Sequence, residues 1–275
     1  MLQVELQGKP QELKPQVMAI LNVTPDSFSD GGKHNSCLQA VTKAMEMIEE
    51  GADIIDIGGE STRPGSAEVS AEEELQRVIP VIEQLSEKTS VPISIDTKKT
   101  IVMREAVSAG AKMVNDVSAL SDKGSISFLS SCNADICLMH MQGIPQTMQD
   151  SPQYKDVAAD VKQYLQKRIE ICLQSGISAK RIIIDPGFGF GKTVEDNYRL
   201  FSNLQQFKDL GCRLLVGVSR KSMIGSVINR PVEERVYGSC ALAALAVVKG
   251  ASIIRAHDIK ATRDAVDLAY MVLTN

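Results

Sequence analysis

The sequence lacks any apolar run long enough to cross a membrane. The longest such run, Cys240–Val248, is far shorter than the roughly 20 residues that a membrane-spanning helix needs. The opening segment, MLQVELQGKPQELKP, has no basic stretch followed by an apolar one, so we expect no secretory signal. These absences predict a soluble, cytoplasmic protein with no membrane partner.

Cysteine pairs and an excess of positive charge are also missing. The six cysteines form no CxxC pair, and several fall in predicted strands or helices, where cysteine acts as a small apolar residue of a reduced protein. The three histidines, His34, His140 and His257, lack zinc-site spacing. A net charge of −4 and a pI near 5.5 give no support for a nucleic-acid partner.

The segment from Asp185 to Thr193 lacks the glycine spacing of two nucleotide-binding loops. Gly191, Lys192 and Thr193 resemble the end of a P-loop, but Pro186 stands where that motif needs its first glycine, and no GxGxxG is present. The glycines with Phe188 and Phe190 predict instead a tight loop that presents an aromatic ring to a flat ligand.

What the sequence does contain is an eightfold alternation of apolar, β-rich segments with segments of helical periodicity. With 275 residues and 44% hydrophobic content, the chain can bury one large core, and eight strand–helix units fit an α/β barrel of roughly 250 residues. We predict a single domain, 1–275, folded as a (β/α)8 TIM barrel with a short N-terminal hairpin over 2–14. An open doubly wound sheet, with its ligand at one switch point, is the alternative.

The expected strands end in residues capable of chemistry. They are Val17–Asn22, Asp53–Asp56, Ile93–Asp96, Met113–Asp116, Asp135–His140, Arg181–Asp185, Leu214–Lys221 and Ser252–His257. Helices are expected from Ser36 to Gly51, after Ser70, and near 99–109, 122–131, 157–175, 194–206, 232–249 and 259–273. All eight strand ends of such a barrel meet at one face, which is where active sites lie.

Four acids or amides and one lysine gather at these ends: Asp56, Asp96, Asn115, Asp185 and Lys221. Carboxylates accept paired hydrogen bonds, an amide both donates and accepts, and an ammonium donates. Such a set could recognise the edge of a flat, guanine-like heterocycle. Each acid alone could instead cap the next helix, but four together favour a ligand.

Long polar loops follow the first two strands, over 22–35 and 58–69, where two to six residues are usual. Their aspartates, hydroxyls and glycines suit lids that close over phosphate, and a solvated loop rich in turn formers is the alternative. Oxygen ligands together with substrate phosphates would suit Mg²⁺. Basic residues near the strand ends suggest an anionic substrate, unless they are ordinary surface residues: Arg63, Lys98, Lys192, Arg220, Lys221, Arg255 and His257.

Together these motifs resemble the dihydropteroate synthases of folate biosynthesis. The matching blocks are NVTPDSFSDGG from Asn22, DIGGESTRPG from Asp56, DTK from Asp96, ND from Asn115, MHMQG from Met139, DPGFGFGK from Asp185, SRKS from Ser219 and RAH from Arg255. The resemblance implies a TIM-barrel transferase that condenses (7,8-dihydropterin-6-yl)methyl diphosphate with 4-aminobenzoate. The products would be 7,8-dihydropteroate and pyrophosphate, and the amine would attack a pterin cation formed by Mg²⁺-assisted loss of pyrophosphate.

The resemblance also implies roles for single residues. Asn22 would bind Mg²⁺, and whether Asp30 or Asp56 contacts the metal directly or through water stays open. The catalytic residues would be Asp96, Lys221, Asp30 and Arg63. The pterin would be held by Asp96, Asn115, Asp185 and Lys221, with Arg255 stacked on its ring. The diphosphate would be held by Thr62, Arg63, Arg255 and His257. The aminobenzoate pocket, where sulfonamides would compete, would comprise Phe28, Pro64, Phe190, Lys221 and Ser222.

Two other functions explain part of the sequence. A pterin-binding methyltetrahydrofolate methyltransferase would share the barrel and the polar strand ends, but would leave the SFSDGG and STRPG loops unexplained. A non-catalytic folate-binding or scaffold protein would not need an intact set of acids, amide and bases. The family resemblance further implies a homodimer formed through late helices, for which the apolar stretch 238–249 could supply a face. Burial of that stretch against its own barrel is the favoured alternative.

Overall fold

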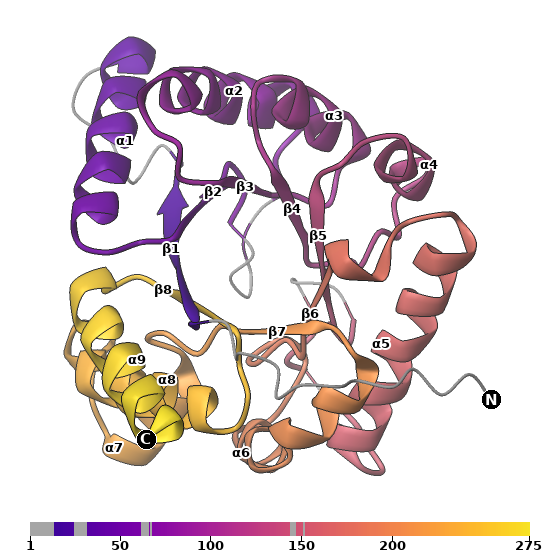
Figure 1. The fold of residues 1–275 in the computed structure, drawn as a ribbon, viewed down its shortest axis with the longest axis vertical. Helices are drawn as coiled ribbons and strands as arrows, with labels where there is room; N and C mark the ends of the chain where they lie inside the picture. Colours follow the sequence, from indigo (N-terminus) through magenta and orange to yellow (C-terminus); the bar gives the residue numbers. More distant parts are fainter. Residues whose placement is uncertain (1–13, 25–31, 62–65, 67, 144–146, 151) are drawn as a thin grey trace.

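The computed structural model describes residues 14–24, 32–61, 66, 68–143, 147–150 and 152–275. In this part of the chain eight parallel strands pair in sequence order and close into a barrel, because β8 also pairs with β1, with Met18 opposite Arg255. Helices surround the barrel on its outside (Figure 1). The predicted TIM barrel is confirmed and the open sheet is wrong. The predicted N-terminal hairpin lies, except for Lys14, outside the described residues.

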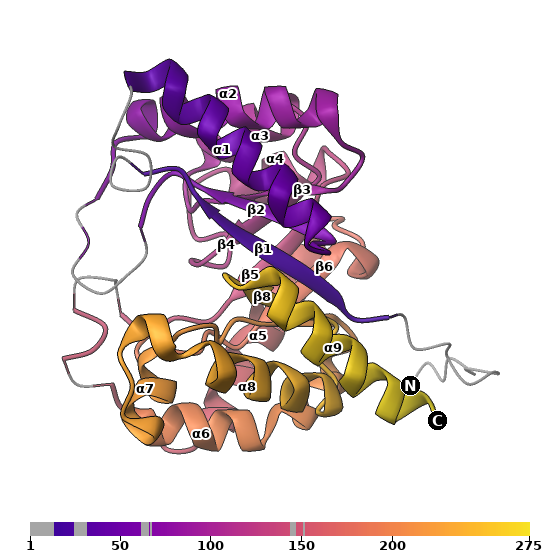
Figure 2. The same cartoon turned by 90° about the vertical axis from the view of Figure 1, so that its left-hand side faces the viewer.

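The strands are short, and most fall where the sequence predicts them. They are β1 (Gln16–Asn22), β2 (Ile54–Gly58), β3 (Ile93–Asp96), β4 (Met113–Asp116), β5 (Asp135–Met139), β6 (Ile182–Asp185), β7 (Arg213–Val216) and β8 (Ile253–Ala256). The α-helices are α1 (Gly32–Glu49), α2 (Ala71–Lys88), α3 (Thr100–Ser108), α4 (Ser125–Ser130), α5 (Val157–Gln174), α6 (Val194–Ser202), α7 (Ser222–Ile228), α8 (Val236–Val248) and α9 (Ile259–Thr274). Figure 2 shows β1 running beside α1 and α9 on one side of the barrel.

Two predicted strand ends are wrong. The seventh strand stops at Val216 and does not reach Lys221, because Arg220 has a φ of 57°, which an extended strand does not tolerate, and Lys221 N donates to Val218 O to close a turn. The short helix α7 then starts at Ser222 and was not predicted. The second strand continues past Asp56 to Gly58, so Asp56 lies within the sheet.

Of two predicted helix caps, the one at α2 is confirmed and the one at α1 is wrong. Ser70 caps α2 as predicted, since its hydroxyl accepts from Glu73 N. Ser36 does not cap α1, which begins at Gly32, because nothing in the sequence Lys33-His34-Asn35 breaks a helix. Within the ranges that the structure describes, no helix is both long and apolar enough to cross a bilayer.

Side-chain alternation along the strands divides the core into two layers. One set of residues forms a small apolar cluster inside the barrel: Met18, Ile54, Met113, Cys137, Ile183, Leu215 and Ile253. Their sequence neighbours, such as Ile55, Val114 and Ile254, belong to the larger core between barrel and helices. Because successive strand residues point to opposite faces, the residue two positions after each interior member also points inward, toward the carboxyl end.

Candidate active site

The polar residues at the carboxyl end of the barrel follow this alternation. Each lies two positions beyond a member of the interior cluster, so it faces the barrel axis above an apolar floor. The pairs are Ile54 and Asp56, Met113 and Asn115, Ile183 and Asp185, and Ile253 and Arg255. The predicted convergence of these side chains therefore results from strand geometry rather than from loop folding.

Arg255 connects the carboxylates of two strands, Asp56 on β2 and Asp96 on β3. Its Nε donates to Asp56 Oδ2 over 2.6 Å and its Nη2 donates to Asp96 Oδ2 over 2.7 Å. Asn115 Nδ2 donates to the same Asp56 oxygen over 3.0 Å. Asp56 is fully buried, and its Oδ1 has no hydrogen-bond partner among the described residues. One carboxylate thus orients an arginine and an amide that were both predicted to touch the pterin.

Burial changes the proton affinity of this cluster. Desolvation raises the pKa of Asp96 to about 7, against the opposing effect of Arg255, and nearby Asp56 and Glu74 raise it further. Asp185 also has a raised pKa, chiefly through burial, while Lys221 acts in the opposite direction. The neighbouring carboxylates raise the pKa of Arg255, which stays cationic. The strand ends therefore combine a cation, Arg255, with one carboxyl, Asp96, whose proton exchanges near neutral pH.

Lys221 approaches the site from the turn before α7. Its Nζ donates to Phe188 O and lies 4.7 Å from the centroid of the Phe190 ring. Burial lowers the pKa of Lys221 to about 8, with Arg255 acting in the same direction and Asp185 against it. Asp185 Oδ1 accepts from Gly187 N over 2.8 Å. This places an ammonium, an aromatic ring and a carboxylate around the β6 and β7 ends.

Of the two rings in the Asp185–Thr193 loop, one is available to a ligand. Phe188 is fully buried and packs on Phe201, with ring centroids 5.7 Å apart, so it belongs to the core. Phe190 is half-buried beside Lys221. Phe190 is therefore the ring of this loop that can contact a ligand, and Phe188 is not.

The β8 end and the start of α7 carry the remaining described candidates. His257 N donates to Ser219 Oγ over 3.2 Å, and Ser219 Oγ lies 3.1 Å from His257 Nδ1. Ser222 is the first residue of α7 and is exposed. The structure thus brings the predicted histidine beside the serine–arginine–lysine turn, but gives Ser222 no side-chain contact that would define its role.

Asn22 and Asp96 flank Gly58. A Cβ added to Gly58 would lie 3.7 Å from Asn22 Oδ1 and 3.8 Å from Asp96 Oδ2, so the missing side chain leaves a small space edged by two oxygens. Hard oxygen donors of this kind suit Mg²⁺ when a substrate supplies further oxygens. The described residues contain no cluster of three or more His, Cys, Asp or Glu side chains that could hold a metal alone.

The predicted basic face is smaller than the sequence suggested. Lys98 pairs with Glu60 and Glu68, and Arg220 Nε donates to Asp258 Oδ2 over 2.9 Å. Lys192 is buried and bonds to protein atoms. Each of these three cations is already paired with oxygen atoms of the chain itself, so fewer cations are left to face an anion than the sequence predicted.

Five predicted residues lie outside the described ranges: Phe28, Asp30, Thr62, Arg63 and Pro64. Their roles stay predictions. The start of the second long loop, at Glu60, is described, and ion pairs hold it in place. Lys99 Nζ donates to Glu60 and to the fully buried Glu74. The sequence analysis assigned no part to Lys99 or Glu74, although the helical periodicity of 71–88 placed Glu74 beside apolar positions.

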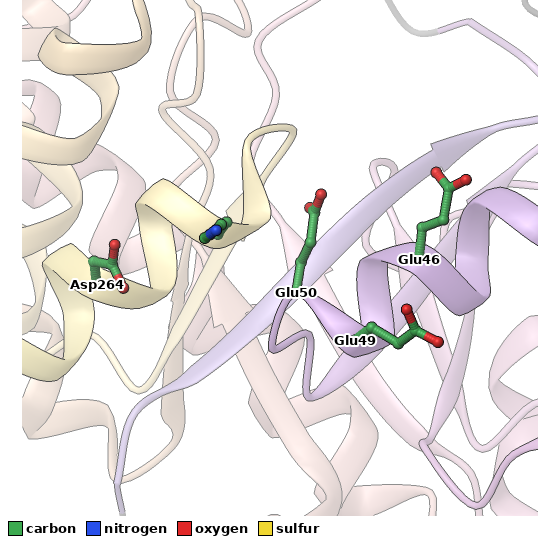
Figure 3. A pocket seen from close by; sticks show the side chains of 5 residues that line it. Glu46, Glu49, Glu50 and Asp264 are labelled. Carbon is green, nitrogen blue, oxygen red and sulfur yellow. The ribbon is translucent and has the colours of Figure 1, made fainter.

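A separate shallow depression lies on the outside of the barrel between α1 and α9 (Figure 3). It is lined by Glu46, Glu49, Glu50, Lys260 and Asp264. None of the predicted site residues takes part in it, and it does not belong to the strand ends.

The structure is a closed parallel barrel with carboxylates, an amide and two cations at its carboxyl end. This arrangement is typical of enzymes that act on small molecules. Comparison with known proteins identifies the family. Residues 18–257 match the family described as pterin binding enzyme. Dihydropteroate synthase of Escherichia coli (strain K12) is 51% identical over 269 residues, covering 98% of this chain and 95% of the relative.

Two solved structures agree in fold. Dihydropteroate synthase of Yersinia pestis, in complex with a sulfonamide drug, has a TM-score of 0.90 at 48% identity, covering 95% of each chain. That of Xanthomonas albilineans with 4-aminobenzoic acid also has a TM-score of 0.90 at 48% identity, covering 96% of this chain and 94% of the other. The chain belongs to the pterin-binding enzymes. Within them it is a member of the dihydropteroate synthase family, a family of transferases.

Proposed function

We propose that the strand ends of this chain condense (7,8-dihydropterin-6-yl)methyl diphosphate with 4-aminobenzoate, giving 7,8-dihydropteroate and pyrophosphate. The observation that carries the proposal is the network of Arg255, Asp56, Asp96 and Asn115 at the barrel mouth. It offers donors and acceptors matched to a pterin edge. The 51% identity to a dihydropteroate synthase along nearly the whole chain supports the same reaction.

In this mechanism Asp96, Asn115 and Asp185 accept hydrogen bonds from the pterin N–H groups, and Lys221 donates to its carbonyl side. Breaking the carbon–oxygen bond to pyrophosphate leaves positive charge on the pterin, which the Asp96 carboxylate stabilises. Arg255 and His257 lie at the β8 end, where barrels frequently hold phosphate, and would stabilise the leaving diphosphate with Thr62 and Arg63. The amine of 4-aminobenzoate then attacks the pterin methylene carbon and loses a proton.

The aminobenzoate would lie against the Phe190 ring and Lys221, the two groups that meet 4.7 Å apart. Phe28, Pro64 and Ser222 would complete its pocket, and Asp30 would contribute from the first long loop. A sulfonamide, which resembles 4-aminobenzoate in shape and charge, would compete for this pocket.

The space at Gly58 fits a magnesium ion. Asn22 Oδ1 would bind the ion together with diphosphate oxygens, and Asp96 Oδ2 lies across the same space. Bound there, Mg²⁺ would neutralise negative charge on the departing pyrophosphate.

We further propose a single catalytic domain that works as a cytoplasmic homodimer. All six cysteines are free, which suits a reducing compartment. Helices α8 and α9 pack on each other and leave large apolar side chains exposed, among them Tyr237 at 84%, Leu268 at 70% and Val272 at 77%. A second copy of the chain covering this surface would remove it from water. Sedimentation of the purified protein at micromolar concentration should show twice the 29.8 kDa chain mass.

The direct test is pyrophosphate release from the pterin diphosphate, measured with and without 4-aminobenzoate and Mg²⁺. We expect release to need Mg²⁺ and to accelerate with 4-aminobenzoate. Transfer of a methyl group from methyltetrahydrofolate, with no use of the diphosphate, would instead support the methyltransferase alternative. Pterin binding with no turnover of either substrate would support the scaffold alternative.

A further inference from the structure

The loop between β6 and α6 is held by side chains along its whole length. Every backbone carbonyl from residue 187 to residue 193 accepts a hydrogen bond from a side chain. The donors are Lys192 Nζ to Gly187 O and Phe190 O, Lys221 Nζ to Phe188 O, Gln149 Nε2 to Gly189 O, Tyr154 OH to Gly191 O, and Asn197 Nδ2 to Lys192 O and Thr193 O. The loop is therefore fixed without belonging to a helix or a sheet.

Lys192 lies at the centre of this arrangement. Its side chain folds back under its own loop, where the residue is only 2% exposed. Nζ lies 2.7 Å from Gly187 O, 3.0 Å from Phe190 O and 3.0 Å from His140 Nδ1. An ammonium has three N–H bonds, and each finds one acceptor here. Burial lowers the pKa of Lys192 to about 7, so its charge is costly here, and the pairing of all three donors is what allows the ammonium to lie inside.

His140 supplies the third acceptor from the preceding strand end. Its ring is neutral, since burial lowers the pKa of His140 to about 3 and Lys192 acts in the same direction, so Nδ1 can accept. Tyr164 meets the ring edge-on, with centroids 5.0 Å apart, which fixes its orientation. Lys192 thus joins the loops that follow β5 and β6.

The two loops approach closely because glycines face the contact. A Cβ on Gly187 would lie 1.9 Å from His140 O, and one on Gly191 would lie 2.3 Å from Gln142 O. Both glycines have a positive φ, of 70° and 60°. A residue with a side chain fits at neither position, so the glycines are what lets the two backbones approach.

This loop contacts groups that the proposed function needs. Phe188 O anchors the Lys221 ammonium, the Phe190 ring lies below the same ammonium, and Gly187 N holds the Asp185 carboxylate. A shift of the loop would therefore move the aromatic wall, the lysine and a pterin acceptor together.

We propose that Lys192, paired with His140, is a positioning residue: it locks the 187–190 loop so that Phe190 and Lys221 are preset for the aminobenzoate. The proposal rests on the proposed function for the roles of Phe190 and Lys221. Lys192 itself touches no substrate, since its N–H bonds are all taken by protein acceptors. It would act on binding geometry and not on the chemistry of bond cleavage.

The test compares Lys192→Met with Lys162→Met. Methionine keeps much of the stem but removes the three donors. Lys162 on α5 serves as the control, because its side chain is partly exposed and its Nζ pairs with Asp209 over 2.6 Å. Amide hydrogen exchange of the substrate-free protein should accelerate at least tenfold in the peptide spanning 187–190 of Lys192→Met, with barrel-strand peptides unchanged. The KM for 4-aminobenzoate should rise at least tenfold, and more than kcat falls. Lys162→Met should match the parent in both.

A second pair of variants covers the case in which Lys192→Met does not fold. His140→Leu removes the Nδ1 acceptor and keeps an apolar side chain, whereas His140→Asn places an amide oxygen near the Nδ1 position. We expect His140→Leu to show faster exchange at 187–190 and a raised KM, and His140→Asn to restore both. Parent-like exchange in Lys192→Met or His140→Leu, or faster exchange with an unchanged KM, would overturn the proposal. If the parent protein shows no condensation at all, the proposed function fails, while the exchange result still decides whether Lys192 locks the loop.

Discussion

Arg255 and Asp96 come from strands 159 residues apart in sequence, yet Arg255 Nη2 donates to Asp96 Oδ2 over 2.7 Å at the barrel mouth. The contact forms because β8 and β3 both end at the carboxyl face and both side chains point inward. It holds in one place the cation and the carboxylate that we propose to contact the pterin, and Arg255 opposes the rise in the pKa of Asp96 that burial causes.

Removing either charged pterin contact should abolish most activity. We expect Asp96→Ala and Lys221→Ala each to lower kcat/KM by about 100-fold or more, the usual size for losing a group that stabilises developing charge. Steady-state kinetics with the pterin diphosphate check this. Asp135→Asn is a matched control, since Asp135 pairs with Arg213 away from the site, and it should leave kcat/KM within about twofold. Parent-like kinetics in both alanine variants would contradict the site assignment.

Activity should show a narrow optimum in pH. Asp96 must be ionised to accept from the pterin, and its raised pKa of about 7 means that kcat/KM falls as pH drops below 7. Lys221 must be protonated to donate, and its lowered pKa of about 8 means that kcat/KM falls as pH rises above 8. A profile of kcat/KM from pH 5 to 10 reports these groups of the free enzyme. Loss of the acidic limb in Asp96→Asn would identify its source, and a flat profile across neutrality would refute it.

Asp56 should matter for stability as well as for activity. Asp56→Ala leaves Arg255 with one buried partner fewer, and breaking a buried ion pair from one side costs about 3–5 kcal/mol. Chemical denaturation should show a loss of that order, with a drop in kcat/KM because Arg255 and Asn115 lose their shared acceptor. Asp135→Asn, which disturbs a half-exposed pair, should cost about 1 kcal/mol or less. Equal losses in the two variants would show that Asp56 has no special part.

The magnesium site can be tested through Asn22 and Gly58. Chelation should stop turnover, and Asn22→Ala should raise the Mg²⁺ concentration for half-maximal activity at least tenfold. Gly58→Ala places a methyl group in ordinary contact distance of both oxygens, so it should keep the thermal midpoint of unfolding within a few degrees while also raising the Mg²⁺ requirement. An unchanged Mg²⁺ requirement in both variants would place the metal elsewhere.

Much of the site can be predicted from the sequence because its residues lie on strands, where alternation fixes the direction of each side chain. Once Ile183 is recognised as interior, Asp185 two positions later must face the same way, and the same holds for Met113 and Asn115. Contacts between loops cannot be predicted in this way. The burial of Lys192, the core position of Phe188 and the left-handed backbone of Arg220 depend on which loops pack together. No local pattern encodes those long-range contacts, so the sequence predicted a basic face and a longer seventh strand.

The central claim is that the strand ends join a pterin diphosphate to 4-aminobenzoate. The most direct measurement follows both products of one reaction, with pyrophosphate detected enzymatically and 7,8-dihydropteroate by mass spectrometry, in the presence of Mg²⁺. We predict equal amounts of the two products, competitive inhibition by a sulfonamide against 4-aminobenzoate, and about 100-fold slower formation of both products by Asp96→Ala. Pyrophosphate without dihydropteroate, or no product from the parent protein, would contradict the claim.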